Sequence, residues 1–227
     1  MTDAGRVEKH YASEDITARV LAALRNVMGP DVPITPDTLA PIDHFHGKGV
    51  IATEELTSLL QPKTSDHLLD IGCGIGGPAR WIAAKYGCRV TGVDLTPEFC
   101  EAARELNTLT GLSDCVQILH AGALSLPGPD NSFDGAYSQA ALMNISDKRG
   151  VFREVFRVLR PSGLLALSLV GAGTAGEPTI HCLGPSRPPS ASSPRQPKYN
   201  AICSRSAFRS YLSVILAPSL PRLLRRS

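Results

Sequence analysis

One stretch of this 227-residue chain constrains its fold more than any other. Residues 67–71 (His-Leu-Leu-Asp-Ile) are mostly apolar and predict a short buried strand. Residues 72–77 (Gly-Cys-Gly-Ile-Gly-Gly) predict a tight turn, because glycine adopts backbone conformations that other residues avoid. Residues 77–86 then have a helical pattern. A strand, a glycine turn and a helix in this order indicate a site where free backbone N–H groups face a ligand.

The same alternation continues along the chain. Strands are predicted at 88–95, 116–119, 133–138 and 164–170, and helices at 97–110 and 148–159. This order predicts an α/β domain whose parallel sheet has helices on both faces. Ligands of such sheets bind beyond the carboxyl ends of the strands. Before the alternation, helical segments are predicted at 14–28, 35–39 and 48–60, with Ser13 and Thr35 as N-caps.

Charge and composition distinguish the C-terminal part of the chain from the rest. Residues 178–227 contain no Asp or Glu, but eight Lys and Arg, ten Ser and eight Pro, so we expect this tail to be disordered. The remainder has 15 basic and 21 acidic residues, and an acidic body disfavours nucleic acid as a partner. The expected organisation is an N-terminal helical lid at 1–60, a ligand-binding core at 61–177 and the tail.

The sequence also bears on location. It has no apolar run near the ~18 residues of a membrane-spanning helix, and its N-terminus lacks the apolar region of a secretory signal. Its six cysteines include no Cys-x-x-Cys pair and are interpreted as reduced thiols. A cytoplasmic location is therefore expected, and the oligomeric state stays open.

Two acidic residues indicate which kind of ligand the glycine turn binds. Gly72, Gly74 and Gly77 fit the Gly-x-Gly-x-x-Gly pattern of dinucleotide sites, so an NAD-dependent oxidoreductase is one hypothesis. Asp94 ends the second strand, where a carboxylate can accept hydrogen bonds from ribose hydroxyls. Asp70, two positions before the first glycine, instead favours a ligand with a cationic ammonium group and no pyrophosphate.

Four motifs in succession carry a family resemblance. They are residues 70–77, 93–96 (Val-Asp-Leu-Thr), 132–134 (Ser-Phe-Asp) and 158–163 (Val-Leu-Arg-Pro-Ser-Gly). In order and spacing, residues 7–177 resemble the class I S-adenosylmethionine-dependent methyltransferases. The resemblance implies a Rossmann-like, doubly wound parallel sheet of strand order 3-2-1-4-5. Relatives continue into further strands, which we expect to be missing or disordered here because residues 178–227 do not match.

The resemblance also implies a role for each matching residue. The turn would hold the methionine part of S-adenosylmethionine, with Asp70 near its ammonium group. Asp94 would bind the ribose and Leu95 would lie against the adenine. The cofactor-binding residues expected in this way are Tyr11, Asp70, Gly72, Gly74, Gly76, Asp94, Leu95, Ser138 and Gln139. One departure is Gly122, where relatives have an Asp that accepts from the adenine amino group.

The N-terminal segment bears on the methyl acceptor. Residues 7–11 and 43–49 resemble the lid of methyltransferases of the sarcosine/dimethylglycine and ubiquinone-biosynthesis type. Tyr11 would then reach the methionine carboxylate, and His46 would line the pocket as a candidate catalytic base. His44 and His46 lack the further ligands that a metal site needs, so no metal is expected. We expect a small-molecule acceptor, with an amine favoured.

The sequence of the tail, residues 178–227, allows two hypotheses about its origin. A back-translation of residues 178–185, read two bases later, gives His-Tyr-Pro-Leu-Pro-Trp-Ala, which resembles what relatives carry after the fifth strand. A reading-frame change near residue 177 is therefore one hypothesis, and a divergent native tail is the other. A non-catalytic cofactor-binding relic joins the methyltransferase and the oxidoreductase as a functional alternative.

Overall fold

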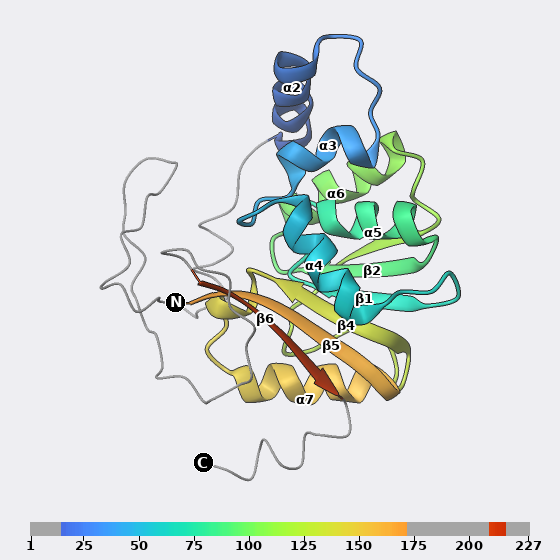
Figure 1. Cartoon of the computed structure of the whole chain (residues 1–227), viewed down its shortest axis with the longest axis vertical. Coiled ribbons are helices and arrows are strands. Elements are labelled where there is room, and N and C mark those ends of the chain that lie inside the picture. Colours follow the sequence, from blue (N-terminus) through green and yellow to red (C-terminus); the bar gives the residue numbers. More distant parts are fainter. Residues whose placement is uncertain (1–14, 172–208, 217–227) are drawn as a thin grey trace.

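The fold is a six-stranded sheet with helices on both faces (Figure 1). The structure is a computed structural model and describes residues 15–171 and 209–216. The sheet order is β3-β2-β1-β4-β5-β6, and strands β1 to β5 are mutually parallel. The strands are β1 (His67–Ile71), β2 (Arg89–Asp94), β3 (Val116–His120), β4 (Phe133–Gln139), β5 (Leu159–Gly171) and β6 (Arg209–Leu216). The predicted doubly wound sheet of order 3-2-1-4-5 is confirmed.

The helices also follow the sequence pattern closely. They are α2 (Ile16–Met28), α3 (Pro36–Asp43), α4 (Val50–Leu60), α5 (Gly77–Tyr86), α6 (Pro97–Leu109) and α7 (Lys148–Val158), with a 3₁₀ turn η1 at Leu142–Asn144. Thr35 caps α3 as predicted. Asp15 is the N-cap of α2, and the predicted cap Ser13 lies outside the described residues.

Helix α3 is longer than predicted. The sequence indicated a turn ending at Leu39, but the helix continues through Pro41 to Asp43. Leu39, Ala40 and Asp43 are buried, so packing against the rest of the domain extends the helix past its proline. This extension places Asp43 next to the glycine turn, as described below.

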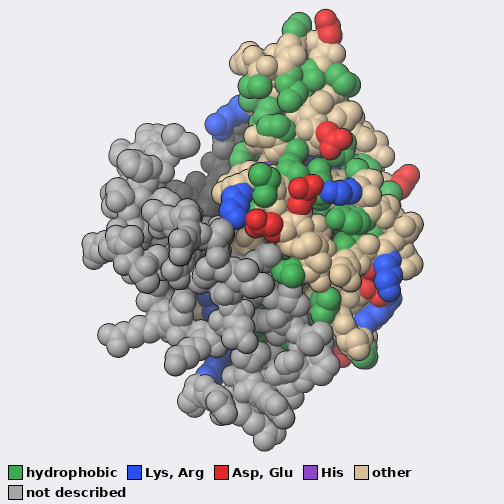
Figure 2. All heavy atoms as spheres, in the orientation of Figure 1, with side chains coloured by type: hydrophobic (Ala, Val, Ile, Leu, Met, Phe, Trp, Pro, Cys, Tyr) green, Lys and Arg blue, Asp and Glu red, His purple; other side chains and the backbone are tan. Residues whose placement is uncertain are grey.

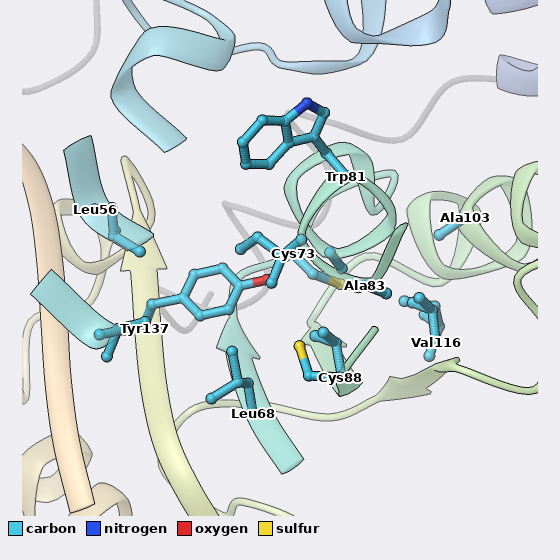
Figure 3. Close-up of a cluster of buried hydrophobic side chains, with 14 of the residues drawn as sticks. Leu56, Leu68, Cys73, Trp81, Ala83, Cys88, Ala103, Val116 and Tyr137 are labelled. Atoms are coloured by element: carbon cyan, nitrogen blue, oxygen red, sulfur yellow. The ribbon is translucent and has the colours of Figure 1, made fainter. Parts of the chain in front are cut away.

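Alternate residues of the central strands supply two cores. Leu68 of β1 faces α4, α5 and α6, together with Tyr137 of β4. Figure 3 shows this cluster, with the Tyr137 ring extending from β4 so that its hydroxyl points toward Cys73. Leu69 and Ile71 point to the other face, where they pack with α7. This two-residue period follows from strand geometry and confirms helices on both faces.

The edge beyond β5 differs from the expectation. Further strands were expected to be missing or disordered, which would leave β5 as an open edge. In the structure β6 pairs antiparallel with β5 from Leu164↔Leu216 to Gly171↔Arg209. A paired edge satisfies backbone N–H and C=O groups that would otherwise be exposed. The other tail residues, 172–208 and 217–227, lie outside the described part of the chain.

The topology identifies where a ligand should bind. The chain runs outward from β1 to β2 and β3, then crosses back to β4 on the other side of β1. The crevice at the carboxyl ends of β1 and β4 is therefore the topological switch point. Among the described residues, no helix combines the length and apolar character needed to cross a membrane.

Candidate functional site

The turn after β1 needs its glycines for two different reasons. Gly72, Gly74 and Gly76 have φ values of +78°, +55° and +77°, which lie in the left-handed region. A Cβ on Gly72 would lie 2.2 Å from the Cβ of Ala141, because the turn passes close to the segment after β4. A Cβ on Gly74 would meet no atom within 4 Å. The turn is thus packed against the segment after β4 at Gly72 and open at Gly74.

Asp94 holds this turn to the end of β2. Its Oδ2 accepts the Gly74 N–H at 2.8 Å, and its Oδ1 accepts the Thr96 N–H at 2.9 Å. An ionised carboxylate has about four acceptor positions, so roughly two remain for a ligand. Asp94 is half-buried, which leaves it within reach of a ligand in the crevice.

Asp70 has the most perturbed environment at the site. It is 2% exposed, and burial raises its pKa to about 8, with Asp94 adding to the rise and the neighbouring Tyr137 hydroxyl opposing it. Asp70 and Tyr137 are register partners on β1 and β4. Within the described residues, neither Asp70 Oδ2 nor the Tyr137 hydroxyl has a hydrogen-bond partner of normal geometry. A cationic donor near Asp70 would satisfy its unpartnered oxygen.

Leu95 and Gly122 adjoin each other beside the turn. A Cβ on Gly122 would lie 3.6 Å from Leu95 Cδ1, an ordinary contact distance. The backbone carbonyl of Leu95 also lies 2.9 Å from His120 Nε2. Gly122 is therefore adjacent to the residue expected at the adenine, and a Cβ would fit at its position.

Ser138 and Gln139 end β4 and differ in what they can offer. The Ser138 hydroxyl is fully buried and donates to the Ile71 carbonyl at 2.7 Å, which fastens β4 to β1. Gln139 Oε1 accepts from the Thr53 hydroxyl at 3.2 Å, while its Nε2 has no partner in the described part of the chain. The Gln139 side chain thus has a free N–H donor at the switch point, whereas the Ser138 hydroxyl stabilises the pairing of β4 with β1.

A buried ion pair lies directly behind the turn. Arg80 of α5 donates to Asp43 Oδ2 at 2.9 Å and to Asn107 Oδ1 at 3.0 Å. Both members of the ion pair are almost fully buried. A Cβ on Gly77 would lie 2.5 Å from the Asp43 carbonyl oxygen, so the glycine permits this close approach. Sequence reasoning did not find this network, because its members are far apart in the chain.

His44 and His46 come shortly after Asp43 in the sequence. His44 Nδ1 lies 2.9 Å from Asp43 Oδ1, and the side chain is fully buried. His46 is half-buried, with Nδ1 at 3.5 Å from the Gly47 carbonyl. Their rings meet edge to face at 5.6 Å between centroids. The Nε2 atoms of both rings are buried without a partner among the described residues.

The structure therefore brings most of the predicted site to one edge of the sheet. Asp70, the glycine turn, Asp94 and Leu95 lie at the ends of β1 and β2, and Gln139 lies at the end of β4. Tyr11 lies outside the described residues. Among the described residues, no group of three or more His, Cys, Asp or Glu side chains could hold a metal ion.

This fold, with an acid at the end of β2 bracing a glycine turn after β1, defines a Rossmann-like cofactor-binding domain. Residues 69–167 match the family described as methyltransferase domain. Residues 69–167 therefore form a methyltransferase domain with the fold of the class I S-adenosylmethionine-dependent methyltransferases.

Relatives of this chain have different reactions in their names. It is 43% identical over 111 residues to 24-methylenesterol C-methyltransferase 2 of Oryza sativa subsp. japonica, covering 49% of this chain and 31% of the relative. It is 36% identical over 120 residues to phosphoethanolamine N-methyltransferase 1 of Arabidopsis thaliana, covering 53% and 24%. A solved structure, the [4+2]-cyclase SpnF, has a TM-score of 0.60 at 26% identity, covering 78% and 64%. The chain spans less than half the length of these curated relatives.

Proposed function

We propose that this protein is an S-adenosylmethionine-dependent methyltransferase that acts on a small-molecule amine. The observation that carries the proposal is the pair of acids at one edge of the sheet. Asp94 braces the turn and keeps acceptor positions for a ribose diol, while Asp70 has an unpartnered oxygen that suits an ammonium group. A ligand with both groups, and no pyrophosphate, fits this pair.

The residues present fit the cofactor. Gly74 is open on the side where a Cβ would be, so a ligand can approach the backbone there. Asp94 would accept from the ribose hydroxyls, and Leu95 would contact the adenine. Gln139 Nε2 would donate to the ligand from the end of β4, and Tyr11 would complete the site from the N-terminal segment. Ser138 would border the site at the end of β4, where its hydroxyl donates to the Ile71 carbonyl of β1.

The bound cofactor would supply a methyl group that is already activated on a sulfonium. The protein must then orient the acceptor and exclude water. His46 is a candidate to line the acceptor side. Burial lowers the pKa of His46, with nearby His44 adding to the effect, while the Gly47 carbonyl and Asp43 oppose it. A lowered pKa favours the neutral form of the His46 ring.

The NAD alternative fits less well. A pyrophosphate would bind at the N-terminus of α5, where backbone N–H groups attract anions. A Cβ on Gly77, the first residue of α5, would lie 2.7 Å from Asp43 Oδ1, so a carboxylate occupies that neighbourhood. Burial alone would raise the pKa of Asp43, but the His44 hydrogen bond and the Arg80 charge outweigh it, and the pKa is lowered. An ionised carboxylate there would repel a second anion.

The surface and the cysteines support the remaining expectations. On the face shown in Figure 2, the Lys and Arg side chains of the described residues are interspersed with Asp and Glu and form no basic patch on that face. This supports a small molecule rather than nucleic acid as the partner. Cys73, Cys88, Cys100 and Cys115 are free thiols, in keeping with a proposed cytoplasmic location.

Turnover with labelled cofactor tests the proposal. Purified protein would be incubated with methyl-labelled S-adenosylmethionine and a panel containing sarcosine, dimethylglycine, phosphoethanolamine, a sterol and a phenol. We expect label transfer to at least one amine and formation of S-adenosylhomocysteine. Transfer only to carbon or hydroxyl acceptors would contradict the amine assignment. Cofactor binding without transfer to any acceptor would favour the non-catalytic relic.

A further inference from the structure

The segment from Asp43 to Thr53 crosses the carboxyl edge of the sheet between two fixed points. At one end, Asp43 packs against Gly77 at the start of α5. At the other end, the Thr53 hydroxyl donates to Gln139 at the end of β4. The residues between them therefore lie near the carboxyl ends of β1 and β4, the edge at which such sheets bind their ligands. His44 comes directly after the first fixed point.

Asp43 determines which nitrogen of His44 carries the proton. Its Oδ1 lies 2.9 Å from His44 Nδ1, and its Oδ2 accepts from Arg80. An ionised carboxylate can only accept, so Nδ1 must donate to it. In the neutral ring, the other nitrogen, Nε2, then has a free lone pair.

The free nitrogen of His44 lacks any partner in the described part of the chain. Its side chain is 0% exposed, and its Nε2 is one of the buried unpartnered atoms. Leaving such an atom unsatisfied is unfavourable, which points to a polar partner that a ligand provides. His46 also has a free Nε2, but among the described residues no carboxylate orients its ring.

We propose that His44, oriented by Asp43, is the base that takes a proton from the nucleophilic atom of the methyl acceptor. This inference rests on the proposed function. The lone pair of the acceptor atom forms the new bond to the methyl carbon, and the carbon–sulfur bond breaks with its electrons going to sulfur. The proton of the acceptor atom moves to His44 Nε2 and leaves to solvent after the product. The acceptor therefore belongs to the class whose nucleophilic atom carries an exchangeable proton.

Asp43 and Arg80 act in this scheme as positioning residues. Arg80 holds one oxygen of Asp43 and is itself held by Asn107, which donates to the Val116 carbonyl at 2.9 Å. This chain of contacts joins α3, α5, α6 and β3, so the carboxylate that aims His44 is fixed by the domain core. An aspartate that orients a histidine in this way is a general arrangement for proton transfer.

The first test reads the ring directly and needs no acceptor. The full-length protein would be labelled with ¹⁵N-histidine and saturated with S-adenosylhomocysteine. Long-range ¹H–¹⁵N NMR then reports which nitrogen of each histidine ring is protonated. We expect the neutral His44 ring to carry its proton on Nδ1 and to have an unprotonated Nε2, and D43N to lose this preference. A neutral His44 ring that carries its proton on Nε2 in the wild type would overturn the proposal.

The second test compares three matched substitutions with an amine that the wild type methylates. His44→Asn can still donate to Asp43 but has no Nε2, so we expect kcat to fall by about 10²-fold or more while S-adenosylhomocysteine affinity and the melting temperature are kept. His46→Asn should raise KM more than it lowers kcat. His67→Asn, at the far end of β1, is the control and should leave kcat unchanged.

The outcomes separate this inference from the proposed function. Normal turnover of H44N, or a large kcat loss in H46N alone, would overturn the role of His44 while leaving the methyltransferase assignment in place. If wild-type protein transfers no methyl group to any acceptor, the proposed function fails instead. If H44N does not fold, the NMR result on the wild type still decides the matter.

Discussion

At the scale of single residues, the candidate site is built on carboxylates in contrasting environments. Asp94 is half-buried and donated to by two backbone N–H groups, so it is suited to hold a neutral polar ligand. Asp70 is buried with one oxygen unpartnered, and its pKa is raised to about 8. Asp43 is equally buried, but His44 and Arg80 satisfy it. The three aspartates therefore have different roles, because their burial and their hydrogen-bond partners differ.

Replacing Asp94 by Ala should remove most cofactor affinity. Hydrogen bonds to a charged acceptor contribute ~1.5–3 kcal/mol each, so losing two should weaken binding by about 10²-fold or more. Isothermal titration calorimetry with S-adenosylmethionine measures this. The matched control is Asp130→Ala, which changes an exposed aspartate paired with Arg157 and should leave affinity unaltered. D94A affinity within twofold of the wild type would show that Asp94 does not bind the ribose.

Replacing Asp70 by Asn should change how the ligand-free protein responds to pH. Because the pKa of Asp70 is about 8 when folded against the usual 3.8, the folded state binds more protons between these values. Stability contributed by the protonated group is therefore lost as pH rises through that window, by at most ~1.4 kcal/mol per pH unit. Urea denaturation at pH 5 and 8 should show a smaller decline for D70N. An identical decline in both proteins would contradict the raised pKa.

At the scale of elements, β1, the glycine turn and α5 could be predicted from the sequence, whereas the end of α3 and the strand β6 could not. Local sequence patterns specify β1, the glycine turn and α5. The apolar run of the strand, the glycines of the turn and the apolar spacing of the helix can each be recognised within a few residues. The end of α3 was missed because tertiary packing carries it past Pro41. The pairing of β6 with β5 was missed because a Ser- and Pro-rich composition does not predict a strand.

The glycines of the turn should differ in how well they tolerate Ala. Both Gly72 and Gly74 have positive φ, which disfavours a side chain by about 1 kcal/mol. Only Gly72 would also place a Cβ 2.2 Å from Ala141, whereas Gly74 faces open space. We therefore expect Gly72→Ala to lower the thermal denaturation midpoint well below that of Gly74→Ala. Equal midpoints would show that the turn does not pack on Ala141.

At the scale of the whole molecule, a buried charge network joins the N-terminal helices to the sheet. The sequence predicted the parallel sheet correctly, because the order of strands, helices and glycines along the chain carries that information. The position of the ligand site stays a prediction. Sequence reasoning did not find the Asp43–Arg80–Asn107 network. These residues lie in three helices, α3, α5 and α6, and the two bonded pairs are 37 and 27 residues apart in sequence. Long-range pairing of this kind leaves no local pattern in a single sequence.

Removing one member of this ion pair should be worse than removing both. Arg80→Met leaves the Asp43 carboxylate buried without its cation, which costs about 3–5 kcal/mol of unfolding free energy. The double variant D43N/R80M leaves no unpaired charge there and should recover part of that loss. Equilibrium urea denaturation of both variants and the wild type gives the comparison. A double variant less stable than R80M would contradict the account of the pair.

The glycine turn, Asp70 and Asp94 should together bind S-adenosylmethionine rather than a dinucleotide. Calorimetric titration of the full-length protein with S-adenosylmethionine, and separately with NAD, tests this prediction most directly. We predict saturable binding of S-adenosylmethionine at one site per chain and no measurable heat of binding with NAD. Tighter binding of NAD, or no binding of S-adenosylmethionine to folded protein, would contradict it.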